Sequence, residues 1–238
     1  MTTTLDSHDV AIPTWDDFNR ENEKTDNYCS TRWASKTSRA VFRGSSTGLG
    51  TTLKNNVRLK LMELGLKNPT LLDVGITKWN LRPRRIKGDE YYRTIKKSIV
   101  DKYGTANFLS YAEQSYYKYV INVPGHSSSF RLGSLFKMKS VVLHVAPEYK
   151  IWYDHLLKPY IHYVPVRTDL RDLVKQIQWC EKNPTVCLHI VENAYKFYLE
   201  HLTIAKQCKF LYDTLKEVDN HYLAHPTVDS RYDWVKSK

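Results

Sequence analysis

A serine-rich loop in the middle of the chain carries residue types that suit phosphate binding. The short apolar run at 119–123 predicts a buried strand, and Gly125 follows where that strand ends. The serines at 127–129 can each cap a helix that we expect from Phe130 onward. Arg131 then lies in the first turn, where free backbone N–H groups, the helix dipole and a guanidinium all favour an anion. The pattern predicts a phosphate-binding corner; a plain helix cap beside a solvated arginine is the alternative.

A second loop, Gly44–Gly50, is rich in glycine and hydroxyl groups and follows a predicted strand at 40–43. It lacks the Lys-Ser/Thr of a P-loop. The run Gly44-Ser45-Ser46-Thr47-Gly48 matches the nucleophile elbow of serine hydrolases, although residues 49–52 separate it from the next helix. The loop equally suits close approach of backbone N–H groups to a phosphate, with Arg43 and Arg58 on either side. Both interpretations stay open at this point.

A carboxylate follows the next predicted strand, Val141–Leu143. Glu148 lies where a dinucleotide fold would place an acceptor for ribose hydroxyls, and an exposed loop glutamate is the alternative. Metal-binding patterns are weak, because no D-x-D occurs and the pair His221 and His225 has no third ligand nearby in the sequence. We therefore expect a site that needs no metal.

The charge balance favours an anionic partner. The chain of 238 residues has 36 Lys and Arg against 25 Asp and Glu, a net charge of +11. Its aromatic residues do not alternate with basic ones, as a stacking platform for single strands would require, so nucleic acid is not the expected partner. No run approaches the roughly 20 apolar residues of a membrane span, and the first residues do not resemble a signal peptide. Together with four cysteines that form no CxxC pair, these features predict a cytoplasmic protein.

Strands and helices alternate along the chain. Helices are expected at 56–66, within 91–103, and repeatedly from Asp169, which can cap the first of the last group. Further strands are expected at 71–75 and 161–166. Alternation of this kind predicts an α/β fold with a parallel, Rossmann-type sheet and a helical C-terminus. We expect an N-terminal segment at 1–40, which can begin a short helix at Thr14, a nucleotide-binding domain at 41–220 and a tail at 221–238.

Several motifs in fixed order together resemble a known family. They are Phe42-Arg-Gly-Ser-Ser-Thr47, Tyr117–Val123, Ser129-Phe-Arg131, Ser140–Val145 with Glu148, Leu157–Val166 and Thr168-Asp-Leu170. The ordered set resembles glycosyltransferase family 90, the capsule-associated and protein O-glucosyltransferase-like (Rumi-like, KDELC-like) enzymes, in a short form. The resemblance runs from about Ile12 to about Leu215.

The resemblance implies a GT-B architecture, with a nucleotide sugar bound between two Rossmann-like domains and an N-terminal domain that is reduced or incomplete here. It implies inverting transfer of glucose or xylose from a UDP-sugar to a glycan or protein-linked sugar, without a metal. By motif match Arg131 holds the diphosphate, helped by Ser45 and its loop, and Glu148 lies near the ribose. The full set expected to bind the donor is Arg43, Gly44, Ser45, Thr47, Arg58, Gly125, Ser128, Ser129, Phe130, Arg131 and Glu148.

The general base is the point of departure from the family pattern. In the family this aspartate lies well upstream of the stretch that Ile12-Pro13-Thr14-Trp15 resembles, and only eleven residues precede Ile12 here. Asp9 is the candidate, with Asp16 and Asp17 as the other nearby carboxylates. A donor-binding domain that needs a partner chain for catalysis is therefore the main alternative. A viral or microbial origin, with a location in the host cytoplasm if viral, fits a short, leaderless member, and a homo-oligomer is compatible with the sequence.

Overall fold

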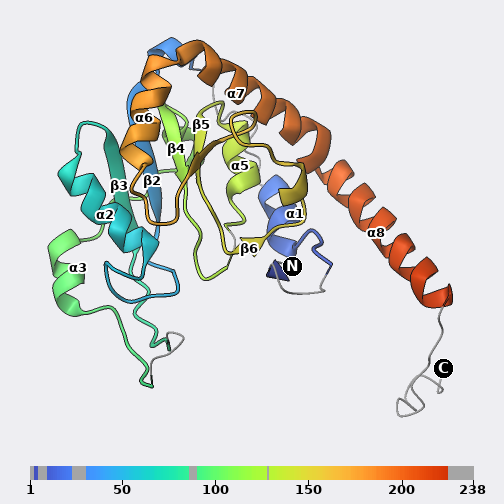
Figure 1. Ribbon diagram of the computed structural model, residues 1–238, viewed down its shortest axis with the longest axis horizontal. Helices are drawn as coiled ribbons and strands as arrows, with labels where there is room; N and C mark the ends of the chain where they lie inside the picture. The colour runs from blue at the N-terminus through green and yellow to red at the C-terminus, as the bar shows by residue number, and fades with distance from the viewer. Residues whose placement is uncertain (1–2, 5–9, 23–30, 86–89, 128, 225–238) are drawn as a thin grey trace.

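The computed structural model describes residues 3–4, 10–22, 31–85, 90–127 and 129–224 of the chain (Figure 1). Its centre is a parallel sheet of five strands in the order β3-β2-β4-β5-β7. The strands are β2 (Thr37–Ser45), β3 (Leu72–Lys78), β4 (Tyr117–Asn122), β5 (Val141–Val145) and β7 (Val164–Val166). A separate antiparallel pair joins β1 (Thr3–Thr4) to β6 (Tyr149–Lys150). The predicted α/β class and Rossmann-type parallel sheet are confirmed.

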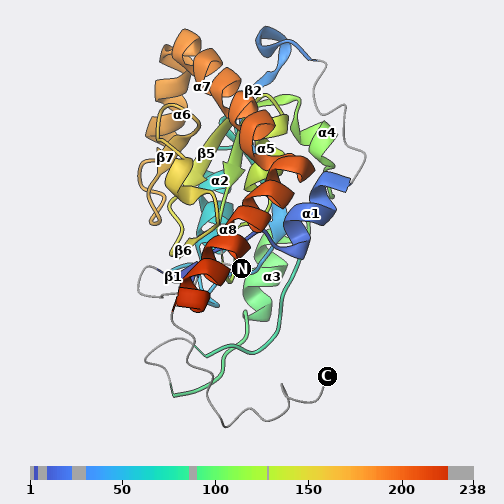
Figure 2. The same ribbon diagram turned by 90° about the vertical axis from the view of Figure 1, so that its right-hand side faces the viewer.

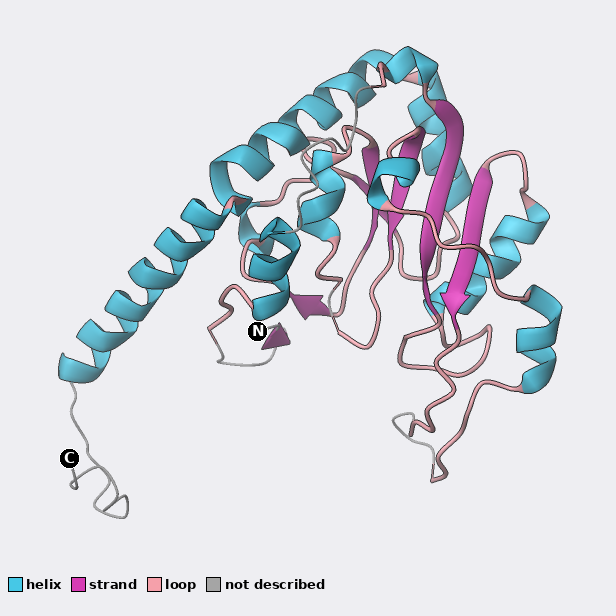
Figure 3. Cartoon of the chain, turned by 180° about the vertical axis from the view of Figure 1, so that it is seen from behind, coloured by secondary structure: helices cyan, strands magenta, loops and turns pink. Residues whose placement is uncertain are grey.

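Helices cover both faces of the sheet (Figure 3). In chain order they are α1 (Trp15–Asn22), α2 (Val57–Lys67), α3 (Lys97–Tyr103), α4 (Tyr111–Gln114), α5 (Leu132–Lys137), α6 (Leu173–Lys182), α7 (Pro184–Phe197) and α8 (Ile204–Ala224). Short 3₁₀ turns lie at Trp33–Ser35 and Asp154–Leu156, and a π-helical turn, Tyr198–Leu202, joins α7 to α8. The helical C-terminus is confirmed as well, and α1 lies against α5 and α8 (Figure 2).

The alternation of side chains along each strand divides the core into two layers. Ala40 and Phe42 of β2 pack with Leu61 of α2, whereas Val41 packs with Leu135 and its neighbours on α5. Successive strand residues point to opposite faces, so a continuous apolar run serves a sheet that is covered on both sides. This arrangement explains why the predicted strands lack a polar alternation.

The amino ends of the central strands are tied together by a buried lysine. Lys36, just before β2, donates from Nζ to the carbonyl of Ser115 at 2.8 Å, to the carbonyl of Met138 at 2.9 Å and to Ser140 Oγ at 2.9 Å. These acceptors precede β4 and β5, and Lys36 is only 4% exposed. The ammonium therefore links the segments that lead into β2, β4 and β5 at the amino end of the sheet.

Two predicted helix starts are wrong. The helix after the serine-rich loop begins at Leu132, with Arg131 at its N-cap and no side-chain cap. The first of the C-terminal helices, α6, begins at Leu173 rather than near Asp169, because Leu170 has a left-handed backbone (φ 58°) that interrupts the turn. Most other elements match, but β7 and α3 are shorter than the predicted ranges.

Candidate functional site

The carboxyl ends of all five strands lie along one edge of the sheet, where the chain also changes direction. From β2 it passes through α2 to β3 on one side, and from β4 through α5 to β5 on the other. The loops that leave β2 and β4 therefore diverge and open a crevice between them. Ligands of open α/β sheets bind in this kind of crevice, at the switch point of the strand order.

A pocket of about 90 Å³ lies along this edge. Its walls come from the loops after four strands: Gly48 after β2, Gly125 and Ser127 after β4, Glu148 after β5 and Thr168 after β7. Gly125 and Glu148, which both belong to the set expected to bind the donor, therefore line one pocket. Ser128 lies outside the described residues.

Arg58 lies between the two loops that border the crevice. Its Nε donates to the carbonyl of Pro124 at 3.1 Å and one terminal nitrogen to that of Val123 at 3.0 Å, both after β4. The other terminal nitrogen donates to the carbonyl of Ser45 at 2.9 Å and to Thr47 Oγ1 at 2.6 Å, both on the β2 side. Arg58 therefore bridges the two diverging loops. Burial first, and then the nearby positive charge of Arg131, lowers its pKa to about 10.

The local sequence explains how Arg58 reaches this place. Asn56 caps α2, because its side-chain oxygen accepts the backbone N–H groups of Arg58 and Leu59. Gly125 leaves room for the guanidinium, since a β-carbon at this position would lie 3.0 Å from Thr47 Oγ1 and 3.3 Å from a terminal nitrogen of Arg58.

Arg131 approaches the same place from the other side. Its guanidinium donates to the carbonyl of Arg43 at 2.7 Å and to Gln114 Oε1 at 2.8 Å. Its central carbon lies 5.7 Å from the ring centroid of Phe42, and that of Arg58 lies 5.6 Å from the same centroid. Two of the three arginines that the sequence assigns to donor binding therefore lie against one aromatic ring, where a cation is also attracted to the face of the ring.

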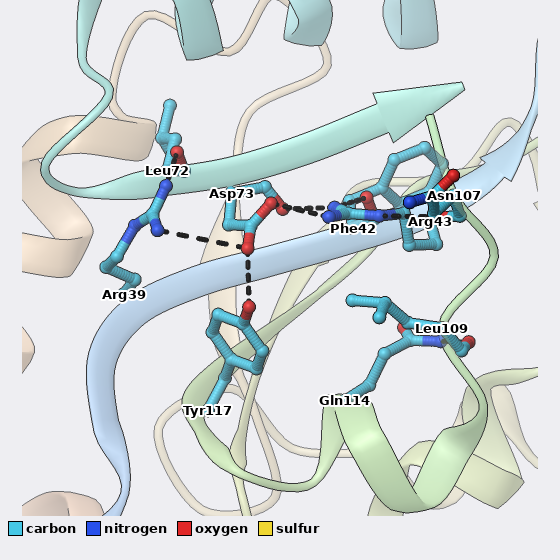
Figure 4. A network of polar contacts seen from close by, with 9 residues as sticks. All are labelled: Arg39, Phe42, Arg43, Leu72, Asp73, Asn107, Leu109, Gln114 and Tyr117. Atoms are coloured by element: carbon cyan, nitrogen blue, oxygen red, sulfur yellow. Dashed lines mark hydrogen bonds and ion pairs between the residues drawn. The ribbon is translucent and has the colours of Figure 1, made fainter. Parts of the chain in front are cut away.

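Arg43 points elsewhere. Its guanidinium forms an ion pair with Asp73 on β3 at 2.7 Å and donates to the carbonyl of Asn107 at 3.2 Å (Figure 4). Asp73 also accepts from the hydroxyl of Tyr117 and lies 3.9 Å from Arg39. Partial burial alone would raise the pKa of the Asp73 carboxyl, but the hydrogen bonds from Tyr117 and Arg43 lower it below its usual value. The side chain of Arg43 is thus neutralised by a carboxylate, and only its carbonyl faces Arg131.

The remaining predicted residues take different positions around the edge. Gly44 and Ser45 end β2, and a β-carbon on Gly44 would lie 3.0 Å from the ring of Phe42. Ser129 accepts the backbone N–H of Leu132 through its carbonyl. Phe130 lines a smaller cavity that also contains Asp17.

The predicted base lies outside the described residues, because Asp9 is not among them. Asp17 accepts from the backbone N–H and the hydroxyl of Thr14, at 2.7 and 2.9 Å, so it caps the start of α1 together with Thr14. Burial raises the pKa of the Asp17 carboxyl. Asp16 is exposed.

A larger cavity next to Glu148 was not predicted from the sequence. It measures about 250 Å³ and is lined by His144, Lys150, Asp154 and Tyr163 as well as Glu148. His144 is buried and its Nδ1 lies 2.9 Å from Asn122 Nδ2. Burial lowers the pKa of His144 to about 4. The only sign of this cavity in the sequence is His144, a polar residue inside the apolar run of β5.

The serine hydrolase alternative is not supported by the geometry. Ser46, the nucleophile of that pattern, is fully buried and accepts the backbone N–H of Asn80 at 2.7 Å. A nucleophile elbow needs a strained turn that leads directly into a helix. The backbone of Ser46 does not have the positive φ that would indicate such strain, and α2 begins only at Val57.

Two kinds of feature, a metal-binding cluster and a membrane-spanning helix, are absent from the described residues. No three His, Cys, Asp or Glu side chains gather there in a way that could hold a metal ion. None of the helices in the part of the chain that the structure describes has the length and apolar character needed to cross a membrane.

Comparisons with known proteins agree with the sequence resemblance. The family model described as Glycosyl transferase family 90 matches residues 3–238. The chain is 42% identical to "Uncharacterized protein 035R" of Invertebrate iridescent virus 3 over 229 residues, covering 91% of this chain and 21% of the viral protein. It is 28% identical to "Protein O-glucosyltransferase 1" of Bos taurus over 254 residues, covering 99% of this chain and 60% of the bovine protein. The chain thus spans only part of the length of these relatives.

Similar solved structures include Anabaena Alr3699/HepE in complex with UDP-glucose. That chain has a TM-score of 0.47 and 12% identity, with coverage of 87% of this chain and 54% of the other. TarM has the same TM-score at 14% identity, with coverage of 74% and 35%.

Proposed function

This chain belongs to glycosyl transferase family 90, and from that premise we propose that it transfers glucose or xylose from a UDP-sugar to a glycan or protein-linked sugar. Relatives named protein O-glucosyltransferase support glucose as the first sugar to test. The reaction inverts the anomeric carbon, as the resemblance implies.

One observation carries this proposal: the guanidinium groups of Arg58 and Arg131 both lie against the ring of Phe42 at the switch point of the sheet, and Arg58 is next to Gly125, which lines the pocket together with Glu148. Two positive charges at the carboxyl edge of a parallel sheet suit a diphosphate. The hydrogen-bond acceptors around them that the structure gives are carbonyl, hydroxyl and amide oxygens. Hydrogen bonds to acceptors of this kind orient a guanidinium.

The residues have distinct tasks in the proposed reaction. Arg58 and Arg131 hold the diphosphate and stabilise the charge that develops on UDP as the glycosidic bond to the sugar breaks. Glu148, which is exposed at the pocket wall, accepts hydrogen bonds from the ribose hydroxyls. A base takes the proton of the acceptor hydroxyl as it attacks the anomeric carbon. Asp9 stays the candidate for that base.

A second function of a different kind is a donor-binding module that acts with another polypeptide. It predicts UDP binding without turnover of a UDP-sugar.

Thermal unfolding with UDP, UDP-glucose and UDP-xylose tests the shared part of both functions. A ligand at 100 times its Kd should add about 2.7 kcal/mol to the free energy of unfolding. We expect stabilisation by UDP but not by uridine, and its loss in Arg131→Ala with the fold retained. Absence of any UDP effect in the unmodified protein would overturn the proposal. Measuring UDP release from the sugar donor, with and without glycan acceptors, then separates the enzyme from the binding module.

A further inference from the structure

A single helical turn, α4, contacts Arg131 through two of its residues. Tyr111 and Gln114 are three positions apart, so they lie on the same side of the turn. The ring centroid of Tyr111 lies 5.7 Å from the guanidinium carbon of Arg131, and Gln114 Oε1 accepts from the guanidinium at 2.8 Å. Gln114 is 3% exposed, so this amide is buried where it meets the arginine.

The turn is held in place independently of Arg131. Ser110 and Glu113 form a capping box: Ser110 Oγ accepts the N–H of Glu113 at 3.2 Å, and Glu113 accepts that of Ser110 at 2.7 Å. Gln114 Nε2 also donates to the carbonyl of Leu109 at 2.7 Å. The side-chain amide of Gln114 is thus fixed at both of its polar atoms: Nε2 is bound to the carbonyl of Leu109 and Oε1 to Arg131.

The segment that precedes α4 is joined to the sheet by a hydrogen bond from Arg43, whose guanidinium is held by its ion pair with Asp73. Arg43 donates from Nε to the carbonyl of Asn107, and Leu109 and Gln114 follow a few residues later (Figure 4). The carbonyl of Arg43 also accepts from Arg131. These two acceptors of the Arg131 guanidinium therefore belong to one anchored unit.

We propose that Gln114 is a positioning residue, which fixes the Arg131 guanidinium in the orientation that grips the donor diphosphate. This inference rests on the proposed function. A guanidinium is a planar fork, so two hydrogen bonds to fixed acceptors determine where its other edges point. Ordering the long side chain before the ligand arrives removes an entropic cost from binding. The amide oxygen of Gln114 is neutral, so this contact does not cancel the positive charge of Arg131 as a carboxylate would.

The test compares UDP affinity, by titration calorimetry, in the unmodified protein and in Gln114→Met. Methionine keeps most of the side-chain volume and removes the acceptor. We expect the Kd for UDP and the KM for the UDP-sugar to rise about tenfold, the size expected for one hydrogen bond to a charged group, and kcat to fall as well, because Arg131 also stabilises the charge that develops on UDP. Gln114→Glu keeps an acceptor but adds a negative charge, and we expect it to weaken UDP binding at least as much.

Gln207 provides a matched control. It is also 3% exposed, and its Nε2 donates to the carbonyl five residues earlier, that of Leu202, at 2.7 Å. Gln207→Met therefore loses a buried hydrogen bond of the same kind, from the side-chain amide to a backbone carbonyl, but leaves Arg131 unchanged. We expect a similar loss of stability. We expect the UDP affinity to stay within about twofold of that of the unmodified protein. Three results would each overturn the inference. They are an equal loss of UDP affinity in both methionine variants, an unchanged affinity in Gln114→Met, and UDP binding by Gln114→Glu that is as tight as in the unmodified protein. Failure of the unmodified protein to bind UDP would instead overturn the proposed function and this inference with it.

Discussion

Arg58 and Arg131 hold their guanidinium carbons 5.6 Å and 5.7 Å from the centroid of one ring, that of Phe42. They reach it from opposite sides of the switch point, one from the start of α2 and one from the loop before α5. After burial, the positive charge of Arg131 also lowers the pKa of Arg58, so the two charges oppose each other. A bound anion near both guanidinium groups offsets such repulsion, which is why the pair suits a diphosphate.

Arg58→Lys tests whether Arg58 also supports the fold. A lysine has one nitrogen and cannot reach four acceptors spread over the loops after β2 and β4. We expect the free energy of unfolding to fall by about 2–4 kcal/mol, because buried carbonyl groups lose their partners. Urea denaturation at pH 7 measures this loss.

The control for this prediction is Arg167→Lys. Arg167 is a surface arginine whose side chain is 65% exposed and pairs with Asp169. Its replacement should change stability by less than about 0.5 kcal/mol. Equal stability of Arg58→Lys and the unmodified protein would show that Arg58 does not brace the two loops.

Asp73→Asn tests the anchor beneath Arg43. Asparagine removes the negative charge that pairs with Arg43 and weakens the bond from Tyr117. We expect a loss of about 1–3 kcal/mol at pH 7. The pKa of Asp73 is lowered in the folded protein, so the carboxylate stabilises the fold above its usual pKa of 3.8, and this contribution is lost as the pH falls through the lowered value.

The stability difference between Asp73→Asn and the unmodified protein should therefore shrink in strong acid. Urea unfolding at pH 7 and below pH 3.8 measures it. Asp213→Asn, in an exposed helical pair with Lys209, serves as the control and should have little effect at either pH. A difference that stays constant with pH would contradict the role given to the ion pair.

The sequence predicts those parts of the fold that depend on local patterns. The strands of the central sheet follow from β-branched apolar runs, and α2 follows from its apolar spacing with Gly65 near its end. The resemblance to a family also assigned Arg58 and Arg131 to one ligand, and the structure brings them together. Their roles in binding stay predictions.

Contacts between distant segments could not be predicted in the same way. Arg43 belongs to the same motif as Ser45, yet its side chain pairs with Asp73, thirty positions away on the neighbouring strand. Nothing local distinguishes Lys36, a buried lysine, from the many exposed ones. Gln114 contacts Arg131 only because a capped turn of four residues precedes β4, and a turn so short has no periodicity to detect.

Gly65→Ala tests the close packing of α2 on the sheet. A β-carbon at Gly65 would lie 2.1 Å from Cγ2 of Val74 on β3, which is closer than two carbon atoms can approach. We expect a loss of about 1–3 kcal/mol, even though alanine favours helix formation more than glycine does. Thermal or urea unfolding measures it.

Val74→Ala in the same molecule provides the decisive comparison for Gly65→Ala. Removing the two methyl groups makes room for the new β-carbon, so the double variant should be more stable than the sum of the two single changes predicts. Strict additivity would mean that the helix moves away from β3 instead of meeting Val74.

His144 makes the stability of the fold depend on pH. It is 7% exposed, and burial lowers its pKa from 6.5 to about 4, so the folded protein keeps it neutral. Between these two values the unfolded chain binds a proton at this position and the folded protein does not. Stability is therefore complete above pH 6.5 and falls as the pH decreases toward 4, by about 3 kcal/mol in total.

His144→Gln isolates this contribution. Glutamine can still accept from Asn122 Nδ2 but does not titrate, so the advantage of the unmodified protein over this variant should decrease by about 2–3 kcal/mol between pH 7 and pH 4. Urea unfolding at several pH values measures both curves. Taking their difference removes the opposite effect of Asp17 and Asp154, whose raised pKa values favour the folded state as the pH falls. Parallel curves for the two proteins would show that His144 is protonated equally in the folded and unfolded states, and that the cavity beside Glu148 is wetter than its burial indicates.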